Sequence, residues 1–222
     1  MSDNRRTLQQ AAKPFDPACR ACPRLAGFLD AIAAERPDYH AAPVPDFGDS
    51  RARFLIVGLA PGMHGANRTG RPFTGDHAGI LLYQTLYDFG FASAPESHSA
   101  DDGLQLMDAR VSNAVRCLPP QNKPTPAEVR SCSPYLRHDL EHLPEKAVVL
   151  ALGRIAHDAV LAALGERRSR FAFGHAAEHR PAAGFTLLDS YHCSRYNTQT
   201  RRLTPAMFQA VFRRVRELLD QS

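Results

Sequence analysis

Four short β-rich runs separated by helical patterns constrain the fold of this chain more than any other feature. The runs span residues 53–60, 108–115, 147–152 and 185–191, and each is apolar enough to form a buried strand. Patterns of helical spacing occupy residues 79–89, 126–143, 154–164 and 205–219. Strands that alternate with helices form parallel sheets covered on both faces. The sequence therefore predicts an α/β fold, a three-layer α/β/α sandwich around a mainly parallel four-stranded sheet.

The length of the chain and its apolar content predict one domain. A chain of 222 residues, 44% of them hydrophobic, can bury a substantial core. We expect a single domain over residues 19–222, preceded by a flexible tail over residues 1–18. The sequence has no run of eighteen apolar residues and no apolar signal-peptide core. We therefore expect a soluble, cytoplasmic protein that does not bind membranes, and we expect it to be a monomer.

The charge of the chain is modestly basic, with a net charge of +4 at pH 7. This balance permits a polyanionic partner without requiring one. Arginine suits bidentate phosphate recognition, and arginines cluster at residues 68 and 71, 167–170, 195 with 201 and 202, and 213–216. The last cluster falls on a predicted helix and is typical of a solvated face. Only the clusters beside other motifs indicate a binding surface.

Four of the five cysteines form two local groups. Cys19 and Cys22 lie in CRACPRL, and Cys117 and Cys132 bracket a proline-rich segment. A C-x2-C pair completed by two distant thiolates satisfies either tetrahedral zinc or a [4Fe–4S] cluster, and spacing alone leaves both metals open. Buried, unligated thiols are the alternative, although the first pair lies in a polar stretch. Cys193 has no spacing partner, which indicates a free thiol.

A glycine-rich segment, GLAPGMHGANRTGRPFTGD, follows the first predicted strand and spans residues 58–76. Its glycines let the backbone approach a ligand closely. The segment matches neither the Walker A loop nor the dinucleotide-binding fingerprint. Asp76 directly precedes a helical pattern, so it is either a functional carboxylate or a helix N-cap.

Polar side chains also follow the second and fourth predicted strands. Asn113 stands at the second strand end, where its amide suits the reading of a base edge or the satisfaction of local backbone. His192 follows the fourth strand, with Ser194, Arg195, Tyr196 and Asn197 after it. Ligands bind beyond the carboxyl ends of parallel strands. These segments therefore predict one site that suits contacts with phosphates and bases.

Three motifs in this order resemble those of the iron–sulfur uracil-DNA glycosylases, most closely the family 5, or type b, branch. They are the glycine-rich segment above, SNAVRCLPPQNKPTP and HCSRYNTQTRRLT. The resemblance implies a uracil-DNA glycosylase-like sandwich fold. It also implies a base-excision repair enzyme that removes uracil, hypoxanthine and xanthine from single- or double-stranded damaged DNA. It also implies a [4Fe–4S] cluster bound by Cys19, Cys22, Cys117 and Cys132.

The resemblance also assigns roles to the residues at the strand ends. Ala60 stands where many uracil glycosylases carry an acidic or amide residue, which leaves Asp76, Asn113 and His192 as the catalytic candidates. Cys193 replaces a proline that is common after the motif histidine and that would stiffen the loop. The substrate-binding candidates are Gly62, Met63, His64, Phe73 and Asn113. The DNA-binding candidates are Arg68, Arg71, Ser194, Arg195, Tyr196 and Asn197.

Two other classes of function compete with this interpretation. A non-catalytic iron–sulfur protein that binds nucleic acid or senses oxidation, with Cys193 as its reactive thiol, also fits the basic loops and the cysteines. A zinc-dependent nuclease or deaminase is disfavoured, because the chain lacks the H-x-E and P-C-x-x-C pattern of zinc deaminases. The polar set of Asp76, Asn113 and His192 favours an enzyme, because binding alone does not require it.

Overall fold

A six-stranded sheet in the order β1-β3-β2-β4-β6-β5 forms the centre of the computed structural model, which describes residues 11–221. The strands are β1 (Phe47–Gly48), β2 (Phe54–Gly58), β3 (Ala109–Asn113), β4 (Val148–Leu152), β5 (Glu178–His179) and β6 (Thr186–Ser190). The four central strands are parallel, which confirms the predicted parallel core. The predicted number of strands was wrong, because β1 and β5 extend both edges in antiparallel pairing. Strands of two residues are too short to show an alternating pattern.

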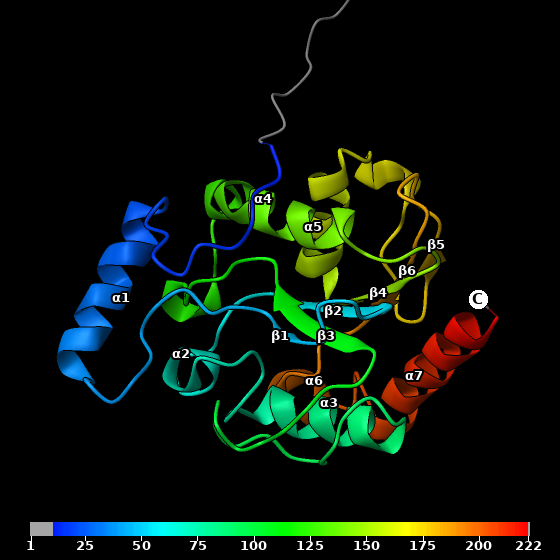
Figure 1. The fold of residues 1–222 in the computed structure, drawn as a ribbon, viewed down its shortest axis with the longest axis horizontal. Helices are drawn as coiled ribbons and strands as arrows, with labels where there is room; N and C mark the ends of the chain where they lie inside the picture. The colour runs from blue at the N-terminus through cyan, green and yellow to red at the C-terminus, as the bar shows by residue number, and fades with distance from the viewer. Residues whose placement is uncertain (1–10, 222) are drawn as a thin grey trace, which may run out of the picture.

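Helices cover both faces of the sheet (Figure 1). α4 and α5 lie on one face, and α3 and α7 lie on the other, as the predicted sandwich requires. The helices are α1 (Pro23–Glu35), α2 (Ala66–Thr69), α3 (His77–Asp88), α4 (Pro126–Glu141), α5 (Arg154–Leu164), α6 (Arg195–Gln199) and α7 (Pro205–Asp220), with short 3-10 turns at Pro120–Asn122 and Arg168–Arg170. Over residues 11–221, no helix is both long and apolar enough to cross a membrane.

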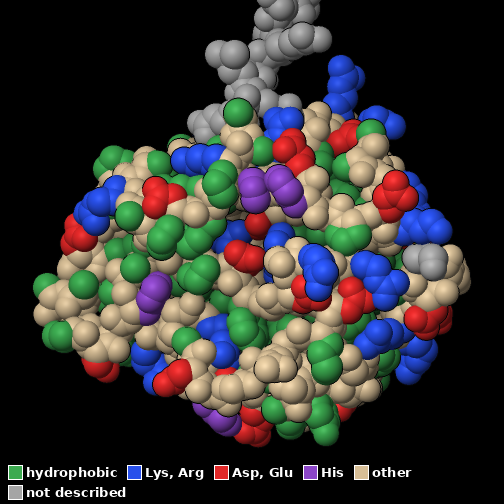
Figure 2. Space-filling view, viewed as in Figure 1, with side chains coloured by type: hydrophobic (Ala, Val, Ile, Leu, Met, Phe, Trp, Pro, Cys, Tyr) green, Lys and Arg blue, Asp and Glu red, His purple; other side chains and the backbone are tan. Residues whose placement is uncertain are grey.

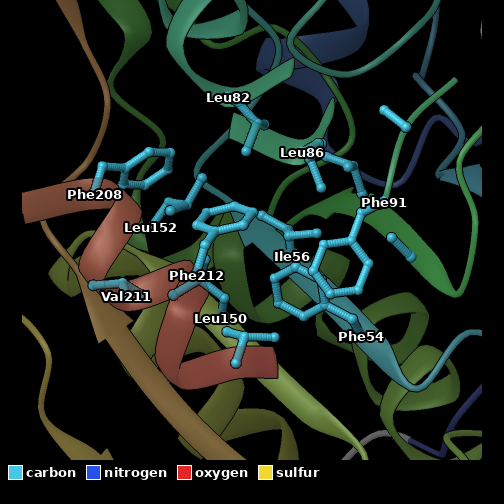
Figure 3. Packing of buried hydrophobic residues seen from close by; sticks show 14 of the residues in the cluster. Phe54, Ile56, Leu82, Leu86, Phe91, Leu150, Leu152, Phe208, Val211 and Phe212 are labelled. Carbon is cyan, nitrogen blue, oxygen red and sulfur yellow. The ribbon is translucent and has the colours of Figure 1, made fainter. Parts of the chain in front are cut away.

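The side chains of β2 show how each central strand serves both layers. Phe54 and Ile56 join the core under α3 and α7, where Phe91, Phe208 and Phe212 gather around them (Figure 3). The alternate residues of β2, Leu55 and Val57, join the core under α4 and α5. Successive side chains of a strand point to opposite faces. Strands buried on both faces therefore read as continuous apolar runs, which is why the sequence reveals them.

Helix α1 was not predicted, although its sequence carries a start signal and a face. Pro23 occupies the first helical position, which suits a residue without an N–H group. Leu25, Leu29 and Ile32 are buried along one side at helical spacing. Arg24 binds Glu128 of α4 through two contacts of 2.7 Å. α1 is therefore tied to the rim of the α4 layer rather than to the sheet.

Residues 11–18, which the sequence analysis assigned to the flexible tail, lie against α4. The Lys13 N–H donates to the carbonyl of Pro134 at 3.2 Å, and the Phe15 ring meets the Tyr135 ring edge-on at 5.6 Å. Residues 1–10 of the expected tail lie outside the described residues. The chain is therefore packed on the domain before Cys19.

Candidate active site

The carboxyl ends of β2 and β3 bring an amide and an aromatic ring together over one glycine. Gly58, the last residue of β2, pairs in register with Asn113 of β3. A Cβ atom at Gly58 would lie 2.5 Å from Asn113 Oδ1 and 2.5 Å from Phe73 Cζ. Real Cβ contacts are never that short. Gly58 is thus the floor on which the two predicted base-binding side chains converge.

Substituting Gly58 by alanine is expected to displace these side chains. Because a misplacement of about 1 Å can cost about 100-fold in rate, we expect kcat/KM for base release to fall by roughly that factor. Single-turnover assays on the folded variant measure it. Gly27→Ala is the matched control, since nothing lies within 4 Å of its Cβ position in α1. A Gly58→Ala enzyme as active as the control would contradict this role.

Phe73 is held in a strained conformation between the other site residues. Its φ is 55°, a region that non-glycine residues rarely adopt. The Tyr83 hydroxyl fixes the preceding residue by donating to the Pro72 carbonyl at 2.7 Å, and a Cβ at Gly79 would lie only 1.7 Å from the Phe73 carbonyl oxygen. The buried Phe73 ring stacks against the His192 ring with centroids 5.9 Å apart. Strain of this kind persists where the surrounding structure enforces it, often at functional sites.

Asp76 is the N-cap of α3, as its sequence position allows, and its second carboxylate oxygen faces the glycine-rich segment. Its Oδ1 accepts from the Gly79 N–H at 3.0 Å and caps α3. Its Oδ2 faces the glycine-rich segment, 3.3 Å from the Cβ position of Gly62 and 2.5 Å from that of Gly65. Burial raises the pKa of the carboxyl group above its usual value, despite hydrogen bonds from the helix N-terminus that lower it.

His192 presents a neutral imidazole to the site. Its Nδ1 is inaccessible to solvent and has no hydrogen-bond partner among residues 11–221, and burial lowers the pKa of the ring to about 4. The backbone is held instead, because Asn197 Nδ2 donates to the His192 carbonyl at 2.8 Å. Gly153, with φ of 95°, lies next to the His192 side chain, since a Cβ atom there would be 3.5 Å from His192 Cβ. His192 is thus an uncharged group whose position is set by its surroundings.

Unpartnered polar atoms mark this region. Asn113 is buried, and its Oδ1 accepts no hydrogen bond from the described residues. Asn67, which the sequence analysis did not single out, is fully buried, and neither its Oδ1 nor its Nδ2 forms a hydrogen bond with the described residues. A buried polar group without a partner costs about 1–3 kcal/mol. Only its place in the glycine-rich segment signals Asn67, because the sequence does not reveal which amides lack partners.

The remaining predicted substrate and DNA residues lie around this centre. Met63 packs against an apolar cluster that includes Leu29 and Ile32 of α1. His64 is exposed, and its Nδ1 lies 2.8 Å from the Tyr39 hydroxyl. Arg68 is exposed within the glycine-rich segment. Arg195 and Tyr196 are exposed on α6, the latter by 70%. Acidic and basic side chains mix on the face in Figure 2, and the exposed local groups named here are the candidates for DNA contact.

The loop after His192 is stiffened without proline. Cys193 is fully buried in the apolar core, and Ser194 caps α6 by accepting from the Asn197 N–H at 3.4 Å. Burial raises the pKa of the Cys193 thiol well above its usual value. Reactive thiols are exposed and have low pKa values. The expectation of a free thiol fits this residue, whereas the role of reactive redox sensor does not.

Arg71, which was predicted to bind DNA, lies inside the protein rather than on its surface. Its side chain is only 5% exposed and pairs with Asp102 at 2.6 Å. The guanidinium also donates to the Ala100 carbonyl at 2.6 Å and to Ser97 Oγ at 3.1 Å, and it lies 4.2 Å from the centre of the Phe47 ring. Arg71 therefore anchors the loop before β3 to the glycine-rich segment. The sequence does not distinguish this buried arginine from its exposed neighbour Arg68.

Replacing Arg71 by methionine is expected to destabilise the protein by about 3 kcal/mol, because it leaves the partly buried Asp102 carboxylate without its counter-charge. Urea unfolding measures the change in the free energy of unfolding. Arg213→Met, on the exposed side of α7, is the control and is expected to change stability by less than about 0.5 kcal/mol. Equal effects of the two substitutions would contradict the anchoring role.

The four paired cysteines meet at the junction of α1, the loop after β3 and α4. Cys19, Cys22, Cys117 and Cys132 line one small cavity with Leu25, Val115 and Tyr135. The Arg116 backbone N–H donates to Cys132 Sγ at 3.3 Å. Two segments that are distant in the sequence thus supply thiols to a common, largely apolar site, as the spacing predicts.

A second polar cluster lies beneath the end of β6. Among residues 11–221, His157, His179 and Asp189 form the only group of at least three His, Cys, Asp or Glu residues whose ligand atoms all lie within 4.8 Å of one another. His157 Nδ1 and His179 Nε2 each contact one oxygen of the buried Asp189, at 2.8 and 3.0 Å. Burial lowers the pKa of His157, but Asp189 outweighs it and the pKa is raised. The cluster is a satisfied ion pair rather than an open ligand set.

The fold and the polar site at its parallel strand ends define a member of the uracil DNA glycosylase superfamily, whose family model matches residues 45–216. Within it, the chain belongs to family 5, as its type-5 uracil-DNA glycosylase relatives show. The Thermus thermophilus enzyme is 49% identical over 206 residues, covering 90% of this chain and 94% of the relative. The Mycobacterium tuberculosis enzyme is 43% identical over 90% of this chain and 78% of its own. The Pyrobaculum aerophilum enzyme is 42% identical over 88% and 87%.

Proposed function

We propose that this protein hydrolyses the N-glycosidic bond of uracil in DNA and leaves an abasic site. The observation that carries the proposal is the set of buried polar atoms at the strand ends that find no hydrogen-bond partner in the described part of the chain, above all Asn113 Oδ1 and His192 Nδ1. A protein that only binds the DNA backbone does not need such atoms. The names of the type-5 relatives support the same reaction.

Asp76 and His192 supply opposite electrostatic effects at the two ends of the breaking bond. Cleavage develops positive charge on the sugar and negative charge on the departing base. The Asp76 carboxylate stabilises the sugar cation or orients the hydrolytic water. The neutral His192 ring donates a hydrogen bond toward the uracil O2 as negative charge accumulates there. Burial of the imidazole, which lowers its pKa, keeps it neutral at physiological pH.

Asn113 and Phe73 recognise the base. Asn113 Oδ1 accepts the uracil N3–H, which satisfies its missing hydrogen bond, and the Phe73 ring stacks on the pyrimidine. The backbone around Gly62, Met63 and His64 lines the same wall, with His64 as a secondary contact. Because a paired base is inaccessible, the nucleotide leaves the stack, as glycosylases are known to require.

DNA contacts surround this base-binding centre. Tyr196, which is 70% exposed, acts with Arg195 as a wedge, while Arg68 and Ser194 contact the backbone. The side-chain amide of Asn197 is already bound to the His192 carbonyl, so this residue acts through the loop. The proposal extends to a monomer that acts on DNA in the cytoplasm.

Cys19, Cys22, Cys117 and Cys132 are the proposed ligands of a [4Fe–4S] cluster. Tetrahedral zinc with bonds of 2.3 Å requires sulfur atoms about 3.8 Å apart, whereas no three thiols among the described residues lie within 4.8 Å of one another. Four thiols around one cavity match the number of corner ligands that a [4Fe–4S] cluster needs. Hydrolysis transfers no electrons, so a cluster held by these four cysteines would supply structure, because the cysteines connect the start of α1 with the loop that carries Cys117.

Cys132→Ser is expected to lower the iron content from about four atoms per protein to below one and to lower the melting temperature. Iron analysis and thermal unfolding measure both quantities. Cys193→Ala is the control, because this thiol lies in the apolar core rather than in the cysteine cavity. Full iron content in Cys132→Ser, or zinc in place of iron in the purified protein, would contradict the assignment.

The reaction is tested with oligonucleotides that carry one lesion each, as single strands and duplexes. We expect alkali-labile abasic sites at uracil, and slower release of hypoxanthine and xanthine, as the resemblance to the branch with broad substrate range implies. An undamaged oligonucleotide is the control substrate. Retention of every lesion by protein that holds its iron and binds the same DNA would refute the proposed activity.

A further inference from the structure

The end of β6, which leads into His192, is held from one side by the segment at residues 174–179. The Ala176 N–H donates to the Asp189 carbonyl, and the Asp189 N–H donates to the Ala177 carbonyl, both at 2.9 Å. The Asp189 carboxylate is fixed by His157 and His179, as described above. Asp189 is three residues before His192, so the strand is rigid up to that point.

His175, in the same segment, contacts Tyr191, the residue immediately before His192. Its Nδ1 accepts from the Tyr191 backbone N–H at 3.3 Å, and its ring stacks on the Tyr191 ring with centroids 5.1 Å apart and planes 22° apart. The Ser190 Oγ atom also lies 3.4 Å from the same Nδ1 atom. Burial lowers the pKa of His175, so Nδ1 remains available as an acceptor.

His192 needs such a support, because no described residue forms a hydrogen bond with its own Nδ1. Its orientation therefore depends on packing against Phe73 and on the backbone at either side of its Cα atom. Asn197 fixes the carbonyl on one side at 2.8 Å. On the other side, His175 accepts from the Tyr191 N–H and so fixes the Ser190–Tyr191 peptide, one residue before the peptide that joins Tyr191 to His192.

We propose that His175 is a positioning residue for His192: it holds the Tyr191 peptide so that the His192 imidazole is preorganised toward the departing base. This inference rests on the proposed role of His192. Preorganised donors contribute to catalysis because they need not reorganise during the reaction. Loss of the support loosens the donor without removing it, so it lowers the rate of the chemical step more than DNA affinity.

Two substitutions separate the hydrogen bond from the ring stack. His175→Phe keeps a ring against Tyr191 and removes the acceptor, whereas His175→Asn places an amide oxygen near the Nδ1 position and removes the ring. We expect kcat on uracil DNA to fall about 10- to 100-fold in His175→Phe with KM within about twofold, and to recover by at least about fivefold in His175→Asn. The fold-changes are smaller than the effect of a missing catalytic group. His142→Phe, on the exposed end of α4, is the control.

Hydrogen exchange gives a readout that is independent of activity. The Tyr191 amide is expected to exchange faster in His175→Phe than in the wild type, while amides in the centre of β6 stay protected. If His175→Phe is unfolded, His175→Leu, which also lacks an acceptor, replaces it. Wild-type kcat in the acceptor-free variant, or equal loss in it and in His175→Asn, would overturn the inference. Failure of the proposed function is distinct, because then wild-type protein releases no uracil or substitution of His192 has no effect.

Discussion

Asp76→Asn is expected to lower kcat for uracil release by about 10²- to 10⁴-fold, the range of a positioned acid–base or charged group, while stability changes by less than about 1 kcal/mol. Asparagine is an equally good N-cap, so its amide oxygen still accepts from the Gly79 N–H, as Asp76 Oδ1 does at 3.0 Å. It removes the negative charge of the oxygen that faces Gly62 and Gly65. Single-turnover rates and urea unfolding measure the two quantities.

Asp76→Ala is the companion variant, because it removes both the cap and the charge. It should match Asp76→Asn in activity and lose about 1 kcal/mol of stability in addition. In the wild type, catalysis requires the charged carboxylate, and burial raises its pKa. Activity should therefore rise with pH through a pKa above the usual aspartate value, and this limb should vanish in Asp76→Asn. Near-wild-type activity of Asp76→Asn would leave Asp76 with only its capping role.

The central strands were predictable because burial on both faces leaves a strong local trace. β2 and β4 are buried at every position, so their sequences are continuous apolar runs. The edge strands leave no such trace, since Phe47–Gly48 and Glu178–His179 pair through only two residues each. Their conformation is decided by neighbouring strands rather than by their own sequence.

The site was predictable where chemistry is tied to a strand end, and not where burial decides the role. Asn113 ends one parallel strand and His192 follows another, and the topology brings such positions to one edge of the sheet. Arg68 and Arg71 are three residues apart in the same segment, yet only the first is free of the buried ion pair with Asp102. Both arginines can be read from the sequence. The sequence does not show that the loop at residues 97–102 folds over Arg71.

The unpartnered atoms of the site make a link between stability and function. Asn113 Oδ1 and His192 Nδ1 are inaccessible to solvent and unsatisfied in the described structure, and most buried polar groups in proteins are paired. Local rules of stability are broken mainly at functional sites. Substitutions that remove these atoms should therefore lower activity without lowering stability, unlike substitutions in the apolar core.

His192→Leu is the sharpest test of that link, because its two expected effects have opposite signs. The loss of a preorganised donor should lower kcat by about 10²- to 10³-fold. An apolar side chain of similar size removes an unsatisfied buried group, so the free energy of unfolding at pH 7 should stay level or rise by about 1 kcal/mol. Single-turnover assays and urea unfolding are compared with Leu188→Ala, a cavity variant in β6 that should lose about 2–5 kcal/mol.

The pH dependence of stability gives His192→Leu a second signature. The pKa of His192 is about 4 in the folded protein and about 6.5 in an unfolded chain. Between these values the unfolded state binds the proton and the folded state does not, so the wild type loses stability as pH falls from about 6.5 to 4. This part of the acid sensitivity should be absent in His192→Leu. A variant that keeps the wild-type kcat, or that loses as much stability as Leu188→Ala, would show that the histidine is held for packing and not for the reaction.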